Sequence, residues 1–188
     1  MNATDWAAWT NQASGELAAS LMGVAPDEID RMADEILTAR QIVCSGMGRE
    51  GLMVRALCMR LMHLGLDAHM AFDMTTPRVG AGDLLIVSSG PGQPGTQAAL
   101  MSRARGERAR TLVVTAQPES AALHAADVVI VLPAQTMADD TGAAASMLPM
   151  GTLFEWLELA FFDLLALRLG ERTNQTVEQI RARHTNLE

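Results

Sequence analysis

Short apolar runs alternate with amphipathic segments along most of the chain. Five runs rich in Val, Ile and Leu predict buried strands: 41–46, 66–72, 82–89, 111–116 and 127–133. Helical spacing of apolar residues predicts helices at 4–22, from Pro26 onward, and at 49–65, 96–108, 118–126, 151–169 and from 173. Strands that alternate with helices form parallel sheets covered on both faces. The pattern therefore predicts an α/β fold, a three-layer α/β/α sandwich with a five-stranded parallel sheet.

At 188 residues the chain suits a single domain. Its expected parts are N-terminal helices at 1–38, a sheet core at 39–150, and C-terminal helices with a tail at 151–188. The helix at 151–169 has more apolar side chains than one face of a sandwich buries. We therefore expect part of it to lie in a subunit interface. The apolar surface of the whole helix includes Phe154, Trp156, Leu157, Phe161 and Phe162.

Composition excludes several classes of protein. The net charge of −8 argues against a general nucleic-acid binder or a binder of anionic membranes. The most apolar stretch is interrupted by Glu155, Glu158 and Asp163, so we expect no membrane span. Cys44 and Cys58 lie in apolar runs without metal-site spacing, which indicates free thiols in a reducing compartment and no metal. With no secretory signal, the expected location is cytoplasmic.

Two loops follow predicted strands at the edge where open parallel sheets bind ligands. They span residues 45–51 and 88–96. The second has the layout of an anion-binding loop, a strand followed by a Gly-rich turn and a helix N-terminus. However, Pro91 and Pro94 each remove a backbone N–H donor from that turn.

Five segments together resemble a known family. They read SGMGREGLMVRALCMRLMHLG, TTP with GDLLIVSSG, ADVVIVLP, LPMGTLFE and RHTNLE. Their order and spacing are similar to those of the sugar isomerase (SIS) superfamily, most of all 6-phospho-3-hexuloisomerase, over residues 30–188. The resemblance implies a flavodoxin-like SIS fold and a homo-oligomer, a tetramer or dimer, with active sites shared between subunits. It also implies interconversion of two ketoses through an enediol, without a metal or organic cofactor.

The resemblance implies roles for particular residues. Glu155 matches the family's catalytic base; the alternative is a helix-surface glutamate without a role. His184 matches a histidine that reaches a neighbouring subunit's site. His63 is either a site group donated across an interface or a cap at a helix C-terminus, and the sequence favours neither. Thr75 and Thr76 match a turn that shapes the site.

Other positions depart from the family pattern. Phosphosugar members typically read Gly-Arg-Ser in the first loop, where this chain has Gly48, Arg49 and Glu50. In the second loop Pro91 and Pro94 replace two further hydroxyl residues. One like-charge pair at about 4 Å costs roughly 4 kcal/mol at an effective dielectric constant near 20, so Glu50 disfavours a phosphate dianion. The alternative is that Glu50 points away and Thr96 takes over phosphate contacts.

These matches and departures define the candidate substrate-binding residues. They are Ser45, Gly48, Arg49, Glu50, Ser88, Ser89, Gly90, Gln93, Thr96, Thr75 and Thr76. The expected partner is a small-molecule sugar or sugar derivative. The favoured hypothesis is a ketose isomerase whose substrate lacks a normal phosphate end. The alternatives are an ordinary 6-phospho-3-hexuloisomerase and a non-catalytic sugar-binding SIS module.

Overall fold

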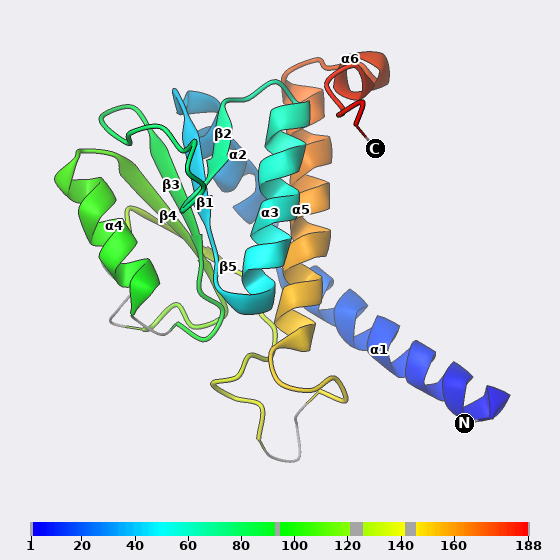
Figure 1. Cartoon of the computed structure of the whole chain (residues 1–188). Helices are drawn as coiled ribbons and strands as arrows, with labels where there is room; N and C mark the ends of the chain where they lie inside the picture. Colours follow the sequence, from blue (N-terminus) through cyan, green and yellow to red (C-terminus); the bar gives the residue numbers. More distant parts are fainter. Residues whose placement is uncertain (1, 93–94, 121–125, 142–145, 188) are drawn as a thin grey trace.

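Five parallel strands form one sheet at the centre of the molecule (Figure 1). The computed structural model describes residues 2–92, 95–120, 126–141 and 146–187. The strands are β1 (Ile42–Ser45), β2 (Ala68–Met70), β3 (Leu84–Ser88), β4 (Arg110–Thr115) and β5 (Val128–Val131). They lie in the order β2-β1-β3-β4-β5, and every neighbouring pair is parallel. The predicted five-stranded parallel sheet is confirmed.

Helices flank the sheet on both faces. They are α1 (Ala3–Gly23), α2 (Glu28–Thr38), α3 (Gly48–His63), α4 (Thr96–Gly106), α5 (Thr152–Arg172) and α6 (Val177–Arg181). Figure 1 shows α3 and α5 side by side on one face, with α2 behind them, and α4 on the other face. Most of the helix predicted at 118–126 lies outside the described residues.

Alternation along each strand divides the core into two layers. In β3, Leu84 and Ile86 face the α2, α3 and α5 side, whereas Leu85 and Val87 face the α4 side. Successive side chains of a strand point to opposite faces, and here both faces are covered. This explains why the strands read as continuous apolar runs rather than as alternating ones.

The apolar surface of α5 is partly buried within the subunit and partly exposed. Phe154, Leu157, Phe161 and Phe162 are all fully buried within the subunit. Trp156, also part of the apolar surface noted in the sequence, is 40% exposed. The other exposed apolar residues of the helix are Leu159, Leu164 and Leu167. Three helices pack on α5 in the same chain, α1, α2 and α3, so its core side is larger than the sequence indicated.

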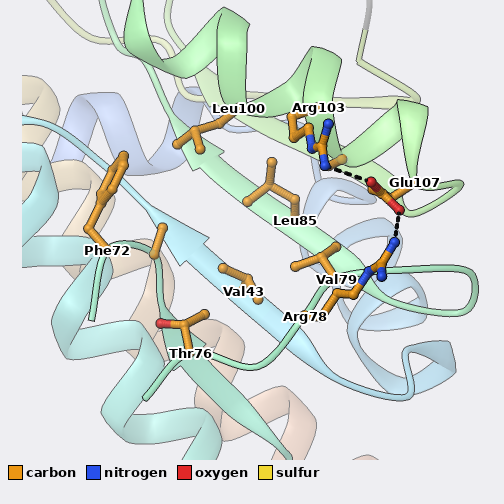
Figure 2. Close-up of a pocket in the computed structure, with 11 residues that line it drawn as sticks. Val43, Phe72, Thr76, Arg78, Val79, Leu85, Leu100, Arg103 and Glu107 are labelled. Atoms are coloured by element: carbon orange, nitrogen blue, oxygen red, sulfur yellow. Dashed lines mark hydrogen bonds and ion pairs between the residues drawn. The ribbon is translucent and has the colours of Figure 1, made fainter. Parts of the chain in front are cut away.

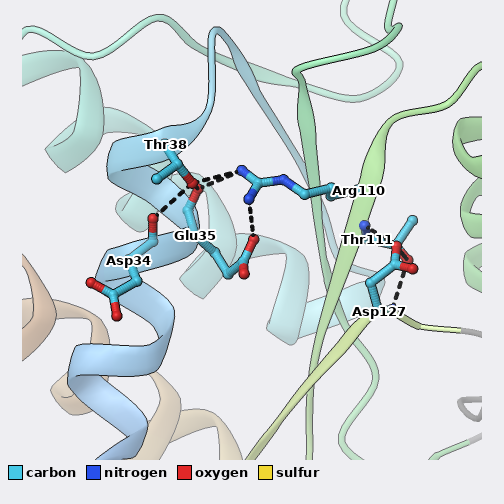
Figure 3. A network of polar contacts seen from close by, with 6 residues as sticks. All are labelled: Asp34, Glu35, Thr38, Arg110, Thr111 and Asp127. Atoms are coloured by element: carbon cyan, nitrogen blue, oxygen red, sulfur yellow. Dashed lines mark hydrogen bonds and ion pairs between the residues drawn. The ribbon is translucent and has the colours of Figure 1, made fainter.

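Arg110, at the start of β4, joins the sheet to α2 (Figure 3). Its guanidinium pairs with Glu35 Oε2 at 2.8 Å and donates to the Glu35 carbonyl and to Thr38 Oγ1. Nearby, Asp127 accepts from the backbone N–H and the hydroxyl of Thr111, both at 2.8 Å. These bonds hold the N-terminal ends of β4 and β5, away from the edge where ligands bind.

The strand order creates a switch point between β1 and β3. From β1 the chain passes to β2 at one edge, and it then returns to β3 on the other side of β1. Ser45 pairs in register with Val87, so the loops after β1 and β3 begin side by side. In open α/β sheets the crevice at such a point is the usual ligand site.

Candidate active site

Arg49 and Glu155 meet at the switch point from two different helices. Arg49 lies in the first turn of α3 and Glu155 in the first turn of α5. Arg49 Nε is 2.7 Å from Glu155 Oε2, and 53% of the arginine side chain but only 14% of the glutamate side chain is exposed. The pair therefore places a largely buried carboxylate beside a solvent-accessible cation.

Burial is the main influence on the ionisation of Glu155. It raises the pKa of this carboxyl from its ordinary value, and the positive charge of Arg49 opposes the rise without cancelling it. A carboxylate with a raised pKa holds an abstracted proton better than an ordinary one does. Glu155 thus has the electrostatic setting that a general base requires.

Glu50 points into the loop after β3. Its Oε2 accepts a hydrogen bond from Ser88 Oγ at 2.5 Å and another from the backbone N–H of Gly90 at 3.0 Å. Burial raises the pKa of Glu50, while these two hydrogen bonds lower it and the nearby Glu155 raises it. The side chain therefore does not point away from the loop, and it takes two donors that an anion would need.

Gly90 is required where the loop touches α5. A Cβ atom at this position would lie 2.7 Å from the Phe154 ring, closer than real side chains approach, and 3.1 Å from Glu50 Oε1. The absence of a side chain lets the Gly90 N–H sit against Glu50 while Phe154 packs behind it. Gly48, with a φ of +55° just before Arg49 and Glu50, also adopts a backbone conformation that favours glycine.

Glu158 adds a third carboxyl group, one turn beyond Glu155 on α5. Its side chain is fully buried, and neither oxygen has a hydrogen-bond partner among the described residues. Burial raises its pKa well above the usual range, the charges of Glu50 and Glu155 raise it further, and Ser88 lowers it. Within the described part of the chain, no group of three His, Cys, Asp or Glu side chains is arranged to hold a metal ion.

Ser45, at the end of β1, contacts a residue that the sequence analysis missed. Its hydroxyl donates to Gln97 Oε1 at 2.9 Å, and both side chains are buried. Gln97 Nε2 is buried without a hydrogen-bond partner among the described residues. Gln97 therefore carries an unpaired amide donor in the first turn of α4, next to the end of β1. Its position directly after Thr96 at a helix start was the only available sequence signal.

The chain is similar in sequence to proteins that carry a name. No protein-family model matches the chain. A Bacillus subtilis (strain 168) protein named 3-hexulose-6-phosphate isomerase is 35% identical over 173 residues, covering 92% of this chain and 94% of its own length. A Mycobacterium gastri protein of the same name is also 35% identical, covering 92% and 86%. The chain belongs to the 3-hexulose-6-phosphate isomerase family.

Solved structures agree with this assignment. A Methanococcus jannaschii protein, for which a 3-hexulose-6-phosphate isomerase function was inferred from its structure, matches with a TM-score of 0.81 and 28% identity, covering 95% of this chain and 98% of its own. An Escherichia coli CFT073 protein, solved in complex with a ligand, shares the fold, with a TM-score of 0.79 and 18% identity over 98% of this chain and all of its own. The expected family, fold class and isomerase class are confirmed.

Other predicted site residues of this 3-hexulose-6-phosphate isomerase family member lie around the same edge. Ser89 is buried, and its backbone bonds to Val114 and Gly92 hold the loop. Thr96 is exposed at the start of α4. The hydroxyl of Thr76 donates within its own turn, to the carbonyls of Met70 and Asp73.

The side chain of Thr75 is exposed in the turn after β2. Gln93 lies outside the described residues, as does Pro94.

His63 and His184 lie at the other end of the helix pair. His63 is the last residue of α3, a helix of 16 residues. Because an α-helix rises about 1.5 Å per residue, His63 lies about 20 Å from Arg49 along the helix axis. The rings of His63 and His184 are 5.1 Å apart between centroids, with His63 buried and His184 exposed. Figure 1 shows the C-terminal segment at the end of α3 and α5 opposite their N-termini. One subunit therefore does not bring these histidines to its own Glu155.

Three cavities differ in their relation to the site. One of 500 Å³ opens at the carboxyl ends of β4 and β5, beside Leu153 at the start of α5. One of 840 Å³ lies at the far end of α3 and α5 and is lined by His63 and α6. The third, of 520 Å³, lies on the other face of the sheet between α4 and the segment around Thr76, with Arg78 and Arg103 paired to Glu107 at its rim (Figure 2). Arg49, Glu50 and Glu155 are not among the described residues that line these three cavities, and of the predicted site residues Thr76 lines the third and His63 the second.

No helix in the described ranges has both the length and the apolar character needed to cross a membrane. This finding agrees with the charged residues that interrupt α5.

Proposed function

We propose that this protein is a ketose isomerase in which Glu155 moves a proton between neighbouring carbons of the sugar. The observation that carries the proposal is the Glu155–Arg49 pair at the switch point, where a carboxylate with a raised pKa faces a cation. Relatives at 35% identity that are named 3-hexulose-6-phosphate isomerase support the reaction class.

The chemistry follows from these two side chains. The Glu155 carboxylate takes the proton from the carbon beside the carbonyl, and the electron pair of that bond forms the enediolate. The Arg49 guanidinium, whose partner Glu155 is then neutral, balances the negative charge on the enediolate oxygen. The proton returns from Glu155 to the former carbonyl carbon, while a hydroxyl proton passes to the former carbonyl oxygen. One carboxyl group therefore serves both carbon steps.

The position of Glu50 supports a substrate that lacks a phosphate at the end that the loop after β3 would bind. It occupies the Ser88 hydroxyl and the Gly90 N–H, the donors that the loop would offer to an anion. Its carboxylate instead presents acceptors, which suit the hydroxyl groups of a neutral sugar terminus. The second candidate, an ordinary 3-hexulose-6-phosphate isomerase, is favoured by the names of the relatives.

A direct test combines binding with isotope exchange. The thermal stability of the protein is measured with fructose and with fructose 6-phosphate, because a ligand of the folded state raises its apparent stability. Exchange of carbon-bound hydrogen for deuterium is then followed by NMR in D₂O. We expect unphosphorylated ketoses to stabilise the protein and to take up deuterium beside the carbonyl. Uptake into fructose 6-phosphate alone would favour the second candidate, and uptake into neither, nor into other ketoses, would contradict an isomerase.

His184 and His63 are assigned to a neighbouring subunit's site. His63 lies about 20 Å along α3 from Arg49 and lines the 840 Å³ cavity, and the ring of His184 is 5.1 Å from that of His63. A histidine suits proton transfer at sugar oxygens near neutral pH. In a symmetric oligomer a subunit can complete its neighbour's site.

Mixing two inactive variants tests this sharing. We expect His184→Asn and Glu155→Gln to be separately inactive and to regain activity when they are unfolded and refolded together. Mixed oligomers then contain some sites with both native residues. Light scattering provides the control, because the wild-type protein must be an oligomer at micromolar concentration. A monomer, or a mixture without recovered turnover, would contradict shared sites.

A further inference from the structure

The connection from β2 to β3 leaves a cavity on the α4 face of the sheet. Parallel strands are usually joined through a helix that covers the sheet. Residues 71–83, which make this connection, contain no helix. The cavity of 520 Å³ lies between this helix-free segment and α4, over Val43 of β1 and Leu85 of β3 (Figure 2). Small-molecule sites occupy about 300 to 1,000 Å³, so the cavity is large enough for one.

Most of the lining of this cavity is apolar. The side chains concerned are Val43, Ala71, Val79, Leu85, Leu100 and Ala104. Thr76 also lines the cavity, but its hydroxyl donates to the backbone carbonyls of Met70 and Asp73. A sugar or a nucleobase needs hydrogen-bond partners when it is buried. This part of the cavity therefore suits a hydrocarbon rather than a polar ring.

Phe72 lies at one end of the cavity, and the charged residues lie at the other (Figure 2). The phenylalanine is 62% exposed, and its φ of +71° lies in a region that few residues other than glycine adopt. Backbone conformations of this kind are concentrated at binding sites. A ligand in the cavity would cover the exposed ring.

Arginines gather around one carboxylate at the charged end. Arg78 Nη2 is 2.8 Å from Glu107 Oε2, and Arg103 Nη2 is 2.9 Å from Glu107 Oε1. The hydrogen bond and charge of Arg78 lower the pKa of Glu107 most, and the charges of Arg103 and Arg108 lower it further. Positive charge therefore exceeds negative charge here, although the whole chain has a net charge of −8.

The two paired arginines keep donors for an anion. Their side chains are 85% exposed for Arg78 and 80% exposed for Arg103. A guanidinium has five N–H donors in a planar fork, and this geometry matches the two oxygens of a carboxylate. Contacts with the single carboxylate of Glu107 leave several of these donors open.

The geometry points to a binding site for an amphipathic carboxylate, an apolar chain with one anionic end, such as a medium-chain fatty acid. The chain lies over Val43 and Leu85 toward Phe72, and the carboxylate joins Arg78 and Arg103. The apolar lining selects the hydrocarbon, and the surplus of positive charge selects the anion.

This site is separate from the candidate active site. The cavity lies on the α4 face, whereas Arg49 and Glu155 belong to α3 and α5, which pack on the opposite face of the sheet. The inference therefore does not depend on the proposed isomerase function, and the binding experiments that test it need no sugar.

The first test compares three ligands on the wild-type protein by calorimetry. We expect octanoate to bind saturably, with one molecule per chain. Octanol, which lacks the charge, should bind about tenfold more weakly, and butyrate, which lacks half of the chain, about a hundredfold more weakly. Equal affinity for octanoate and octanol would overturn the role of the arginines. Octanoate without saturable binding would overturn the site, and this is also the result expected if a second copy of the chain covers this face.

The second test places the ligand in the cavity by substitution. The double variant Arg78→Gln and Arg103→Gln removes both cations, and we expect it to bind octanoate about tenfold or more weakly than the wild type. Val79→Phe adds a ring to the half-buried wall of the cavity and should abolish binding of both octanoate and octanol. The thermal transition of each variant shows whether it is folded.

The matched control is Arg60→Gln, which removes an arginine from the lining of the 840 Å³ cavity. The Arg60 side chain is 47% exposed and pairs with Asp163, so the change again breaks a surface ion pair. Its affinity for octanoate should equal that of the wild type. A loss in Arg60→Gln without a loss in the double variant would place the ligand in the other cavity and overturn the inference. If Val79→Phe does not fold, the ligand series and the arginine variants still decide the outcome.

Discussion

Glu155→Gln is expected to lower turnover by about 10²- to 10⁴-fold, the range that a positioned general acid–base supplies. The amide has nearly the volume of the carboxyl group, but it does not accept a carbon-bound proton. Glu155 is 14% exposed and lies 2.7 Å from Arg49. Because the amide fills the same space, we expect the start of α5 to keep its position. Turnover is measured as deuterium exchange on whichever ketose the wild type converts.

Two comparisons separate chemistry from folding in this experiment. The thermal transition of Glu155→Gln should stay close to that of the wild type, since a partly exposed ion pair contributes about 1 kcal/mol or less. Asp34→Asn, an exposed change on α2, should keep full turnover. Turnover of Glu155→Gln within tenfold of the wild type would remove Glu155 from the reaction.

Glu50→Ser is expected to convert the loop after β3 into a phosphate site. The change removes one negative charge and frees the Ser88 hydroxyl and the Gly90 N–H, both now bonded to Glu50. Removing a like charge at about 4 Å with an effective dielectric constant near 20 is worth up to about 4 kcal/mol. Affinity for fructose 6-phosphate, measured by calorimetry, should therefore rise by about 10²- to 10³-fold.

Glu50→Gln distinguishes charge from occupancy of the loop. Its amide removes the charge but still fills the space and accepts from the same donors, so it should gain much less affinity than Glu50→Ser. Adding Pro91→Ser and Pro94→Thr restores two backbone N–H groups and two hydroxyls, and should increase binding further. Micromolar binding of fructose 6-phosphate by the unmodified protein would contradict a substrate without phosphate and favour the ordinary isomerase.

Local patterns predicted much of this fold. Runs such as Leu84–Ser88 are apolar at every position because both faces of the sheet are covered, and this signature is visible in a few consecutive residues. The helix at 151–169 was also predicted from spacing alone. Its packing was not, because the partners that bury Phe161 and Phe162 come from segments distant in sequence.

The candidate site was likewise only partly predictable from the sequence. The positions of Arg49, Glu50 and Glu155 follow from motifs, and the strand order brings them together at the switch point. Gln97 was missed because nothing near it in the chain indicates that its amide nitrogen is buried without a partner among the described residues.

By itself the sequence determined which residue types are available and where along the chain each element begins, since hydrophobic period and turn residues act over a few positions. Only the tertiary structure decided that Glu50 points into the loop after β3, that Glu158 is fully buried beside it, and that His63 lies at the far end of α3. The physical reason is that burial, hydrogen-bond partners and neighbouring charges are set by segments far apart in the chain, and these set the ionisation of each carboxyl group.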